Sequence, residues 1–351
     1  MNHPFGWGWL ALRATLVVGL LLGSGWGCRK EEPSGTAAQG GAPGFEKAVL
    51  RYQGFTGQVT YPELAEDLGY LAPLRLEYVG NTISGPQDIQ TVVTRDIDFG
   101  GAFNGAVVKL MAAKAPITAV IGYYGVDENT WSGYYVLENS PIRTPRDFIG
   151  KKVSVNTVGA HQEFVLREYL TRAGLTKDEI AQVTLVALPP VSAEQALRQG
   201  QVDVSVLGSI LRDKALERGN IRSVFSDYDL FGKFTAGSIV LTKDFLRDNP
   251  KTARHFVEAT SRAIEWARTS PRDEVVARMT TVINRRGRAE DASATKYWRS
   301  TGIAGQGGLI SDREFQVWVD WLVKDGGLPA GQLAPRDLYT NELNPYFKGP
   351  A

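Results

Sequence analysis

Few residues in this sequence have the types and spacing that catalysis or metal binding requires. Its three histidines, His3, His161 and His255, lie far apart, and Cys28 is its single cysteine. A zinc or iron site needs several such side chains close together, so none is expected. The sequence also lacks the motifs of a nucleophile elbow, a phosphate-binding Walker loop and a dinucleotide-binding loop. It therefore predicts a protein that is not an enzyme and that uses no metal ion or cofactor.

Loops rich in Gly, Asn, Ser and Thr recur between a predicted strand and the start of a predicted helix. Residues 81–86 follow a strand at 74–79, and residues 156–160 follow a strand at 152–155. Open α/β sheets bind ligands at the carboxyl ends of their strands, and helix N-termini offer unpaired N–H groups and partial positive charge. These loops predict a site for a small molecule with an anionic group.

The candidate ligand-binding residues come from these loops, from the first strand and its loop, and from further turns and helix starts. They are Gln53, Phe55, Asn81, Thr82, Ser84, Gly101, Asn104, Trp131, Thr157, Gly159, Ala160, His161 and Gly208. His161 has two interpretations, a donor to an anion or a partly exposed residue at a helix start. Trp131 is either a wall of the cleft or a part of the core. The anionic end is expected at Gly159–His161, with residues 81–84 closing from the other side.

The first thirty residues resemble an export signal. A nine-residue apolar run, 14–22, follows Arg13 and is too short for a membrane span of about twenty residues. Cys28 comes soon after it and resembles the cysteine of a bacterial lipobox, although Gly25 stands where that pattern has Leu. We expect a signal peptide at 1–27, a lipid on Cys28 and a flexible tether at 28–44. An ordinary signal peptide with an incidental cysteine is the alternative.

From Ala48 onward, short apolar runs alternate with helical patterns, which predicts an α/β fold with mostly parallel sheets flanked by helices. A helix–Asp–strand order occurs twice, with Asp98 and Asp203 in equivalent places, and favours two similar lobes with a cleft between them. Both carboxylates are interpreted as partners of nearby backbone groups.

Other local patterns predict helix ends. Capping boxes are expected at Thr176–Glu179 and at Ser192–Gln195, and Asn249–Pro250 is expected to open a long helix. The pair Arg285–Arg286 is interpreted as a solvated helix end or turn.

The charge balance excludes a nucleic-acid partner. The chain has 39 basic and 38 acidic residues in 351, a net charge of +1. No basic excess is available to neutralise phosphates. The 43% of hydrophobic residues is typical of a globular protein.

The order of several segments resembles the type 2 periplasmic substrate-binding proteins of ABC transporters, in the group for aliphatic sulfonates, taurine, nitrate and thiamine-pyrimidine precursors. The resemblance spans roughly residues 49–266, and its most specific part is the block 140–153. The other segments are Arg51–Gln53, Leu68–Leu71, Ser84–Pro86, Asp96–Gly101, His161 and Ala173–Thr176.

This resemblance implies a two-lobed clamshell, with lobe 1 at 45–135 plus 237–351 and lobe 2 at 136–236. The two crossing strands are expected near Tyr134–Val136 and Gly237–Val240. It further implies an exported, membrane-anchored monomer on the periplasmic or cell-surface face, which delivers a small, sulfonate-like anion to an ABC permease. Residues 207–210 replace a Trp and an acidic-Pro turn that such proteins often carry, so a bulkier or more apolar ligand than nitrate or taurine is expected.

Two alternatives stay open, a sensor for a membrane signalling system and a binder of a neutral heterocycle such as a thiamine pyrimidine precursor. The pyrimidine-synthesising relatives of this fold depend on a cysteine-rich motif. Cys28, within the signal segment, does not supply one.

Overall fold

The computed structural model describes residues 43–349. The predicted signal peptide, the lipidated Cys28 and the tether up to residue 42 lie outside the described residues and stay predictions.

The first lobe contains two sheets. Strands β1 (Val49–Gly54) and β2 (Arg75–Asn81) pair in parallel, and β10 (Phe234–Thr242) lies between β3 (Gly100–Phe103) and β4 (Ile117–Val126). Its helices are α1 (Tyr61–Asp67), α2 (Gly85–Val93), α3 (Asn104–Ala112), α9 (Lys243–Asp248), α10 (Pro250–Thr269), α11 (Arg272–Arg285) and α12 (Arg313–Asp325), with short 3-10 turns η2 (Ala292–Tyr297), η3 (Gln306–Gly308) and η4 (Pro335–Asp337).

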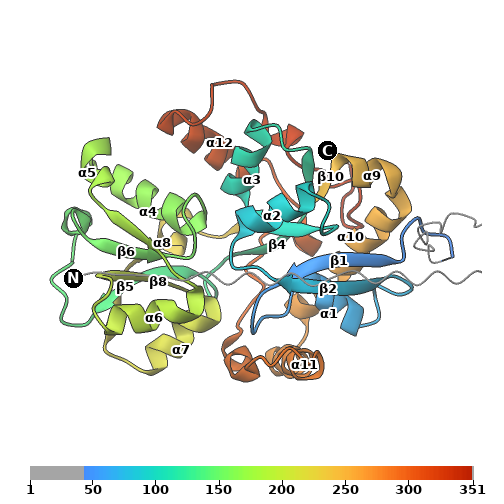
Figure 1. Ribbon diagram of the computed structural model, residues 1–351, viewed down its shortest axis with the longest axis horizontal. Helices are drawn as coiled ribbons and strands as arrows, with labels where there is room; N and C mark the ends of the chain where they lie inside the picture. The colour runs from blue at the N-terminus through green and yellow to red at the C-terminus, as the bar shows by residue number, and fades with distance from the viewer. Residues whose placement is uncertain (1–42, 350–351) are drawn as a thin grey trace, which may run out of the picture. The chain divides into compact units, whose positions relative to one another are not determined.

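The second lobe contains one five-stranded sheet in the order β7-β6-β8-β5-β9. Its strands are β5 (Ser132–Leu137), β6 (Lys152–Val155), β7 (Thr184–Ala187), β8 (Val204–Gly208) and β9 (Ile221–Ser226). Its helices are η1 (Pro145–Phe148), α4 (His161–Arg172), α5 (Lys177–Ala181), α6 (Pro190–Arg198), α7 (Ser209–Glu217) and α8 (Asp227–Phe231). Figure 1 shows α4 and α5 on one face of this sheet and α6 and α7 on the other.

The chain passes between the lobes twice, at 127–131 and at 232–233. The predicted crossing strands lie inside the sheets instead, Tyr134–Val136 in β5 and Gly237–Val240 in β10. The lobe boundaries given in the sequence analysis stay predictions.

The predicted α/β fold with helices flanking the sheets is confirmed, and in each of the two larger sheets one strand runs against its neighbours. Strand β5 is antiparallel to β8 and β9, and β10 is antiparallel to β3 and β4. Each of these two strands follows a passage from the other lobe. β5 is the first strand of its sheet along the chain, and β10 follows β4 only after the whole second lobe. No direct helical crossover of the kind that makes neighbours parallel therefore joins either strand to an earlier strand of its sheet.

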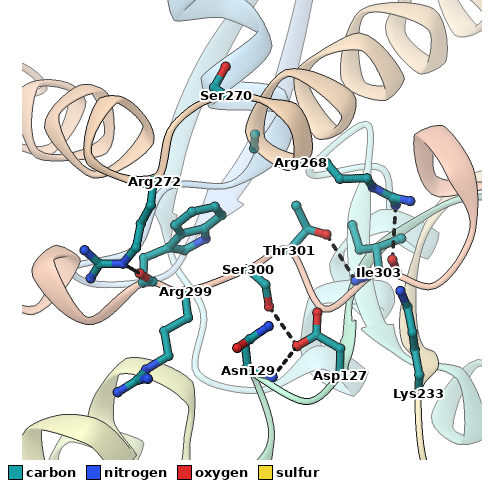
Figure 2. A pocket seen from close by; sticks show the side chains of 12 residues that line it. Asp127, Asn129, Lys233, Arg268, Ser270, Arg272, Arg299, Ser300, Thr301 and Ile303 are labelled. Carbon is teal, nitrogen blue, oxygen red and sulfur yellow. Dashed lines mark hydrogen bonds between the residues drawn. The ribbon is translucent and has the colours of Figure 1, made fainter.

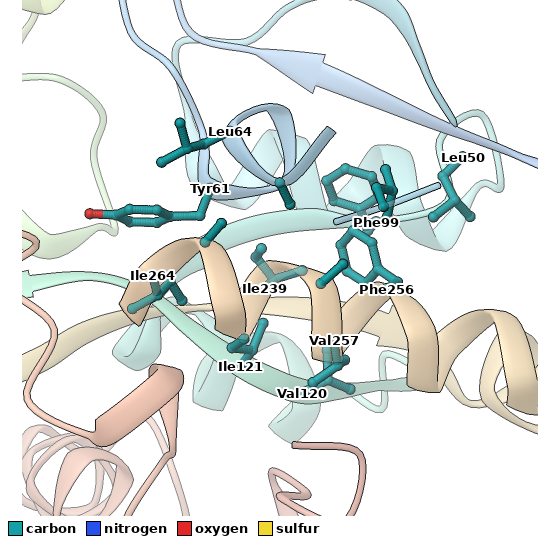
Figure 3. Close-up of a cluster of buried hydrophobic side chains, with 14 of the residues drawn as sticks. Leu50, Tyr61, Leu64, Phe99, Val120, Ile121, Ile239, Phe256, Val257 and Ile264 are labelled. Carbon is teal, nitrogen blue, oxygen red and sulfur yellow. The ribbon is translucent and has the colours of Figure 1, made fainter. Parts of the chain in front are cut away.

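Helix α10 packs across the sheet of the first lobe, as Figure 3 shows. Its buried side chains Phe256, Val257 and Ile264 belong to one apolar cluster with residues of β4 and β10 (Val120, Ile121 and Ile239). Asn249 and Pro250 begin this helix as predicted. In the second lobe, Tyr134 and Val136 join the cluster under α4, whereas Tyr135 joins the cluster under α6 and α7. This alternation is the two-residue period of a strand.

Asp98 and Asp203 have the structural role that the repeat predicted. The Asp98 carboxylate accepts a hydrogen bond from Arg51 N at 2.7 Å, and the Asp203 carboxylate accepts one from Lys152 N at 2.8 Å. Asp98 N and Asp203 N donate in return to Arg51 O and Lys152 O, each at 2.9 Å. The same pair of hydrogen bonds therefore joins a helix exit to a strand in each lobe, β1 in the first and β6 in the second.

One predicted capping box is confirmed and the other is wrong. Thr176 Oγ1 accepts from Glu179 N at 3.2 Å, and Glu179 accepts from Thr176 N at 2.8 Å. Ser192, however, lies inside α6, because Pro190 already begins that helix. A proline is favoured at the first helical position, where its missing N–H is not needed.

Candidate functional site

A cavity of about 480 Å³ lies between the two lobes. The first lobe contributes the loop 55–61 and the start of α2, and the second contributes the starts of α4, α6 and α7. Phe103, Tyr123 and Tyr124 also line it, together with Asp291 and Ala294. The loops after β2, β6, β7 and β8 thus converge on one cavity, at the strand ends where open α/β sheets bind ligands.

Four candidate residues line this cavity, namely Phe55, Thr82, Ala160 and His161. The lining does not include the other nine, which are Gln53, Asn81, Ser84, Gly101, Asn104, Trp131, Thr157, Gly159 and Gly208. Ligand contact stays a prediction for all of them.

Some of these nine residues support the cavity walls. Asn81 Nδ2 donates to Thr56 Oγ1 at 3.1 Å in the cavity loop. Ser84 Oγ lies 3.5 Å from Thr157 Oγ1, and this contact joins the two lobes. Gly208 precedes α7, and a Cβ there would lie 2.7 Å from Ser132 Oγ.

Others are used inside the protein. The fully buried Asn104 donates to Thr235 O at 3.0 Å and accepts from Ser238 Oγ at 2.7 Å. Gly101 makes room for the Tyr123 ring, since a Cβ would lie 2.7 Å from it. The Trp131 ring lies 3.6 Å from the Arg212 guanidinium, and Gln53 Oε1 is buried in β1 without a hydrogen-bond partner.

His161 is held by protein groups on several sides. Its ring stacks on Phe103 at 4.7 Å, its Nδ1 lies 3.5 Å from the Tyr124 hydroxyl, and its Nε2 lies 3.3 Å from Asp227 Oδ2. The start of α4 also carries an acid of its own, because Glu163 accepts from Gly159 N at 2.7 Å. Two carboxylates therefore offset the positive end of this helix.

The start of α7 has the opposite electrostatic character. Its first turn contains no acidic residue and no side-chain cap among the described residues. Ser209 N donates to Trp131 O at 3.1 Å, so the N–H groups that follow it are the ones open to a ligand. Ser209 has a φ of 45° and lies in the cavity wall. Lys214 lines the cavity from the same helix, and its Nζ is 3.9 Å from Asp291 Oδ2. Helix α6 likewise has no acid in its first turn.

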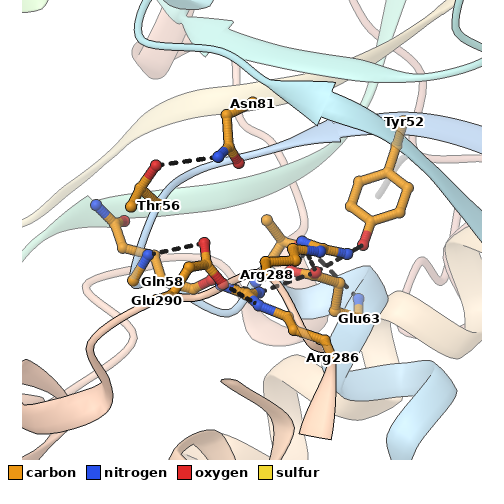
Figure 4. Close-up of polar contacts among 10 residues, drawn as sticks. Tyr52, Thr56, Gln58, Glu63, Asn81, Arg286, Arg288 and Glu290 are labelled. Carbon is orange, nitrogen blue, oxygen red and sulfur yellow. Dashed lines mark hydrogen bonds and ion pairs between the residues drawn. The ribbon is translucent and has the colours of Figure 1, made fainter. Parts of the chain in front are cut away.

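A buried ion-pair network positions the cavity loop (Figure 4). Glu63 Oε1 accepts from Tyr52 at 2.6 Å and from Arg286 and Arg288 at 3.1 Å each. Arg286 also donates to Gln58 O at 2.9 Å within the loop. The interpretation of Arg286 as solvated is therefore wrong, since its side chain is only 8% exposed.

A buried acid lies behind the start of α2. Asp88 Oδ2 accepts from Gly101 N at 2.7 Å, and the residue is 2% exposed. Burial raises the pKa of Asp88 to about 7, although the Gly101 hydrogen bond acts in the other direction. Near neutral pH, part of the population therefore has no charge at this position.

Two contacts between the lobes border the cavity. We call the first the aromatic contact; it joins α4 to the end of β3 and to α12 through Phe103, His161, Phe164, Trp318 and Trp321. We call the second the polar contact; it joins α7 to the segment 291–299 through Asp213, Lys214, Glu217, Asp291, Lys296, Tyr297 and Arg299. Helices α4 and α7 lie on opposite faces of the five-stranded sheet (Figure 1).

A second cavity, of about 270 Å³, lies beside the passages between the lobes (Figure 2). Its arginines are used within the protein: Arg268 donates to Ile303 O at 3.1 Å, Arg272 to Trp298 O at 2.8 Å and Arg299 to Asp213 at 2.6 Å. Asp127 accepts from Ser300 at 2.8 Å. We therefore interpret the polar groups of this cavity as structural, because their hydrogen bonds hold the segments that pass between the lobes.

Two negative findings apply to residues 43–349. No three His, Cys, Asp or Glu side chains gather there in a way that would hold a metal ion. No helix of that part of the chain has both the length and the apolar character needed to cross a membrane.

Sequence reasoning missed several lining residues. Pro189, Pro190 and Val191 follow the short strand β7, so the rule that found the other loops would have found them had that strand been recognised. Asp291 and Ala294 belong to the C-terminal part of the chain, where no strand–loop–helix pattern precedes them. Only the fold brings them to the cavity.

Solved structures with the same fold identify the class of architecture. The chain is similar to the periplasmic aliphatic sulphonate binding protein SsuA from Escherichia coli, with a TM-score of 0.64 and 19% identity over 84% of this chain and 93% of that one. For the alkanesulfonate-binding protein SsuA from Xanthomonas axonopodis pv. citri bound to MOPS, the TM-score is 0.66 and the identity 18%, over 84% of this chain and 99% of that one. For the nitrate-binding protein NrtA from Synechocystis PCC 6803, the TM-score is 0.64 and the identity 13%, over 84% of this chain and 86% of that one. The fold is thus that of the two-lobed periplasmic binding proteins.

Sequence comparison then gives the family. The model of the family described as NMT1/THI5 like matches residues 64–274, and the chain belongs to that family. A curated relative from Escherichia coli (strain K12), named "Putative aliphatic sulfonates-binding protein", is 30% identical over 149 residues, or 42% of this chain and 44% of the relative. The match therefore spans less than half of the relative's length. The predicted family resemblance is confirmed. The curated relative and the solved structures are named for solutes that they bind, in agreement with the prediction of a protein that is not an enzyme.

Proposed function

We propose that this protein is the extracytoplasmic solute-binding component of an ABC importer, and that it binds a small organic anion between its lobes and delivers it to a membrane permease. The observation that carries the proposal is the cavity of about 480 Å³, which receives helix starts from both lobes. Pockets of roughly 300–1,000 Å³ enclose small organic ligands. The sulfonate and nitrate binders among the similar proteins support the same class of ligand.

We place the anionic group of the ligand at the start of α7, in the part of the cavity wall that also contains Lys214. Two observations support this position over the start of α4: the first turn of α7 has no acid, whereas α4 carries Glu163 and faces Asp227. Phe55, Thr82, Ala160 and His161 would then surround the remainder of the ligand.

Calorimetry with a panel of ligands tests the proposal. The panel contains alkanesulfonates, taurine, nitrate, aromatic acids and formylated pyrimidines. A ligand at a hundredfold excess over its Kd should also stabilise the protein by about 2.7 kcal/mol. Binding of neutral heterocycles alone would contradict the anion assignment. Absence of binding by the whole panel would contradict the proposed class of ligand.

Two substitutions test the position of the anionic group. Lys214→Gln should weaken anion binding about tenfold, the low end of the range for a hydrogen bond to a charged group, because its side chain is 31% exposed. Lys243→Gln is the matched control, since Lys243 is exposed on α9 and outside the cavity lining. If His161→Ala loses more anion affinity than Lys214→Gln, the anionic group binds at the start of α4 and not at the start of α7.

The permease is the proposed partner. A transporter gene pair beside this gene would support import, and a membrane kinase gene in its place would favour the sensing alternative.

A further inference from the structure

Two large apolar side chains that are exposed to solvent line the cavity. Within residues 43–349 six such side chains stand out, namely Val79, Ile83, Val158, Val191, Leu216 and Phe347. Ile83 and Val191 both line the cavity, and they are 53% and 67% exposed. Single exposed apolar residues are common, but a group of them at a cavity indicates a binding surface.

Ile83 and Val191 come from different lobes. Ile83 lies in the loop between β2 and α2, and Val191 lies in the first turn of α6. Phe55, Tyr61 and Tyr123 add aromatic surface to the same cavity. A ligand between the lobes would therefore touch apolar side chains from both sides at once.

The charged part of the lining is small by comparison. Lys214 and Asp291 lie 3.9 Å apart, and His161 is the remaining titratable base of the lining. A cavity of about 480 Å³ is also much larger than an inorganic anion needs. The lining therefore combines one charged corner with an extended apolar surface.

We propose that Ile83 and Val191 form an apolar clamp on the tail of the ligand, so that the protein selects organic anions with a bulky apolar tail over short-chain anions. This inference rests on the proposed function, since it assumes an anion held between the lobes. On closure, the two side chains lose solvent contact only when a tail of sufficient length lies between them. The gain in affinity should then rise with the apolar area of the tail.

Calorimetry with ethanesulfonate, 1-hexanesulfonate and 2-naphthalenesulfonate tests the clamp. In the wild type, each further buried methylene should tighten binding about fourfold. Ile83→Ser and Val191→Ser should each weaken the binding of the two larger sulfonates roughly three- to tenfold. In both variants the Kd for ethanesulfonate should stay within twofold of the wild-type value. Val191→Leu should retain the preference for large tails.

Val158→Ser is the matched control. Val158 is 56% exposed and lies in the loop before α4, but it is outside the cavity lining. If it weakens 2-naphthalenesulfonate as much as Val191→Ser does, or if all three sulfonates bind equally well, the clamp is wrong although the proposed function stands. If none of the three binds but another ligand of the panel does, the sulfonate assignment fails and the clamp fails with it.

Discussion

The aromatic contact and the polar contact join the same two lobes by different chemistry. Phe164 of α4 is 3% exposed and belongs to an apolar core of the first lobe, with Phe103 at 5.4 Å and Trp321 at 4.3 Å between ring centroids. In the polar contact, by contrast, the side chains of Glu217 and Arg299 are 62% and 55% exposed. Burial of a Phe side chain stabilises by about 1.5–3 kcal/mol, whereas an exposed ion pair contributes about 0–1 kcal/mol.

This difference indicates which of the two contacts breaks when the lobes separate. Opening at the aromatic contact would expose Phe164 and the tryptophans of α12. Opening at the polar contact would separate side chains that are mostly solvated already, with the buried Asp213 as the exception. We therefore expect the lobes to pivot about α4 and to part between α7 and the segment 291–299. Ligand would enter past Lys214 and Asp291.

The largest expected effect comes from the aromatic contact. Phe164→Ala should lower the free energy of unfolding by about 3–5 kcal/mol, because it leaves a void between the two lobes. Urea denaturation measures the loss. The matched control is Phe347→Ala, at a ring that is 37% exposed, which should change stability by less than about 0.5 kcal/mol. Equal losses in both variants would contradict the role of α4 as the pivot.

Distances between labels test the pivot directly. Spin labels at positions 217 and 296 span the polar contact, and labels at 177 and 325 span α5 and α12, where Lys177 Nζ donates to Asp325 O at 3.2 Å. Addition of a ligand should shorten the first distance clearly and leave the second almost unchanged. A larger change in the distance between labels at 177 and 325 would show that the lobes part at the aromatic contact and not at the polar contact.

A substitution in the polar contact should have a smaller effect on stability. Arg299→Gln should cost less than about 1 kcal/mol, because the Arg299 side chain is 55% exposed and Asp213 keeps its 2.7 Å bond to Arg212. In 1 M NaCl, where the Debye length is about 3 Å, the difference from the wild type should shrink further. A loss as large as that of Phe164→Ala would show that the polar contact is not the weaker one.

Acid should loosen the polar contact by a small amount. The Tyr297 hydrogen bond and Lys296 hold the pKa of Glu217 below its ordinary value of 4.5. A lowered folded-state pKa gives a contribution that is present above the unfolded-state value and is lost as the pH falls through the folded-state value. Between pH 7 and pH 3.5, the wild type should therefore lose a small part of its free energy of unfolding in urea. Glu217→Gln, which cannot titrate at this position, should lose less over the same pH range.

Local structure followed from the sequence where neighbouring residues decide it. The capping box of Thr176 and Glu179 forms within one turn, so its chemistry is complete in four residues. Asp98 and Asp203 were recognisable because each repeats a short pattern before a buried strand. The family resemblance added the two-lobed arrangement, which the solved structures confirm.

The predictions failed where the outcome depends on residues far along the chain. Arg286 follows a helix and resembles a solvated end, but Glu63 from α1 reaches it and burial follows. Strands β5 and β10 run antiparallel because each enters its sheet from the other lobe, which no local pattern records. The role of His161 as an anion donor stays a prediction, and the structure adds Asp227, from α8, facing its Nε2.

The sequence by itself determined the α/β elements and the strand-end loops, because hydrophobic period and helix-start chemistry act over a few residues. Only the tertiary structure decided which of those loops face the cavity and with what charge. Lys214 and Asp291 meet there from different lobes, and Ile83 and Val191 do the same. Such pairings depend on how two lobes fit together, and the free energy of that fit is spread over many weak contacts between distant segments.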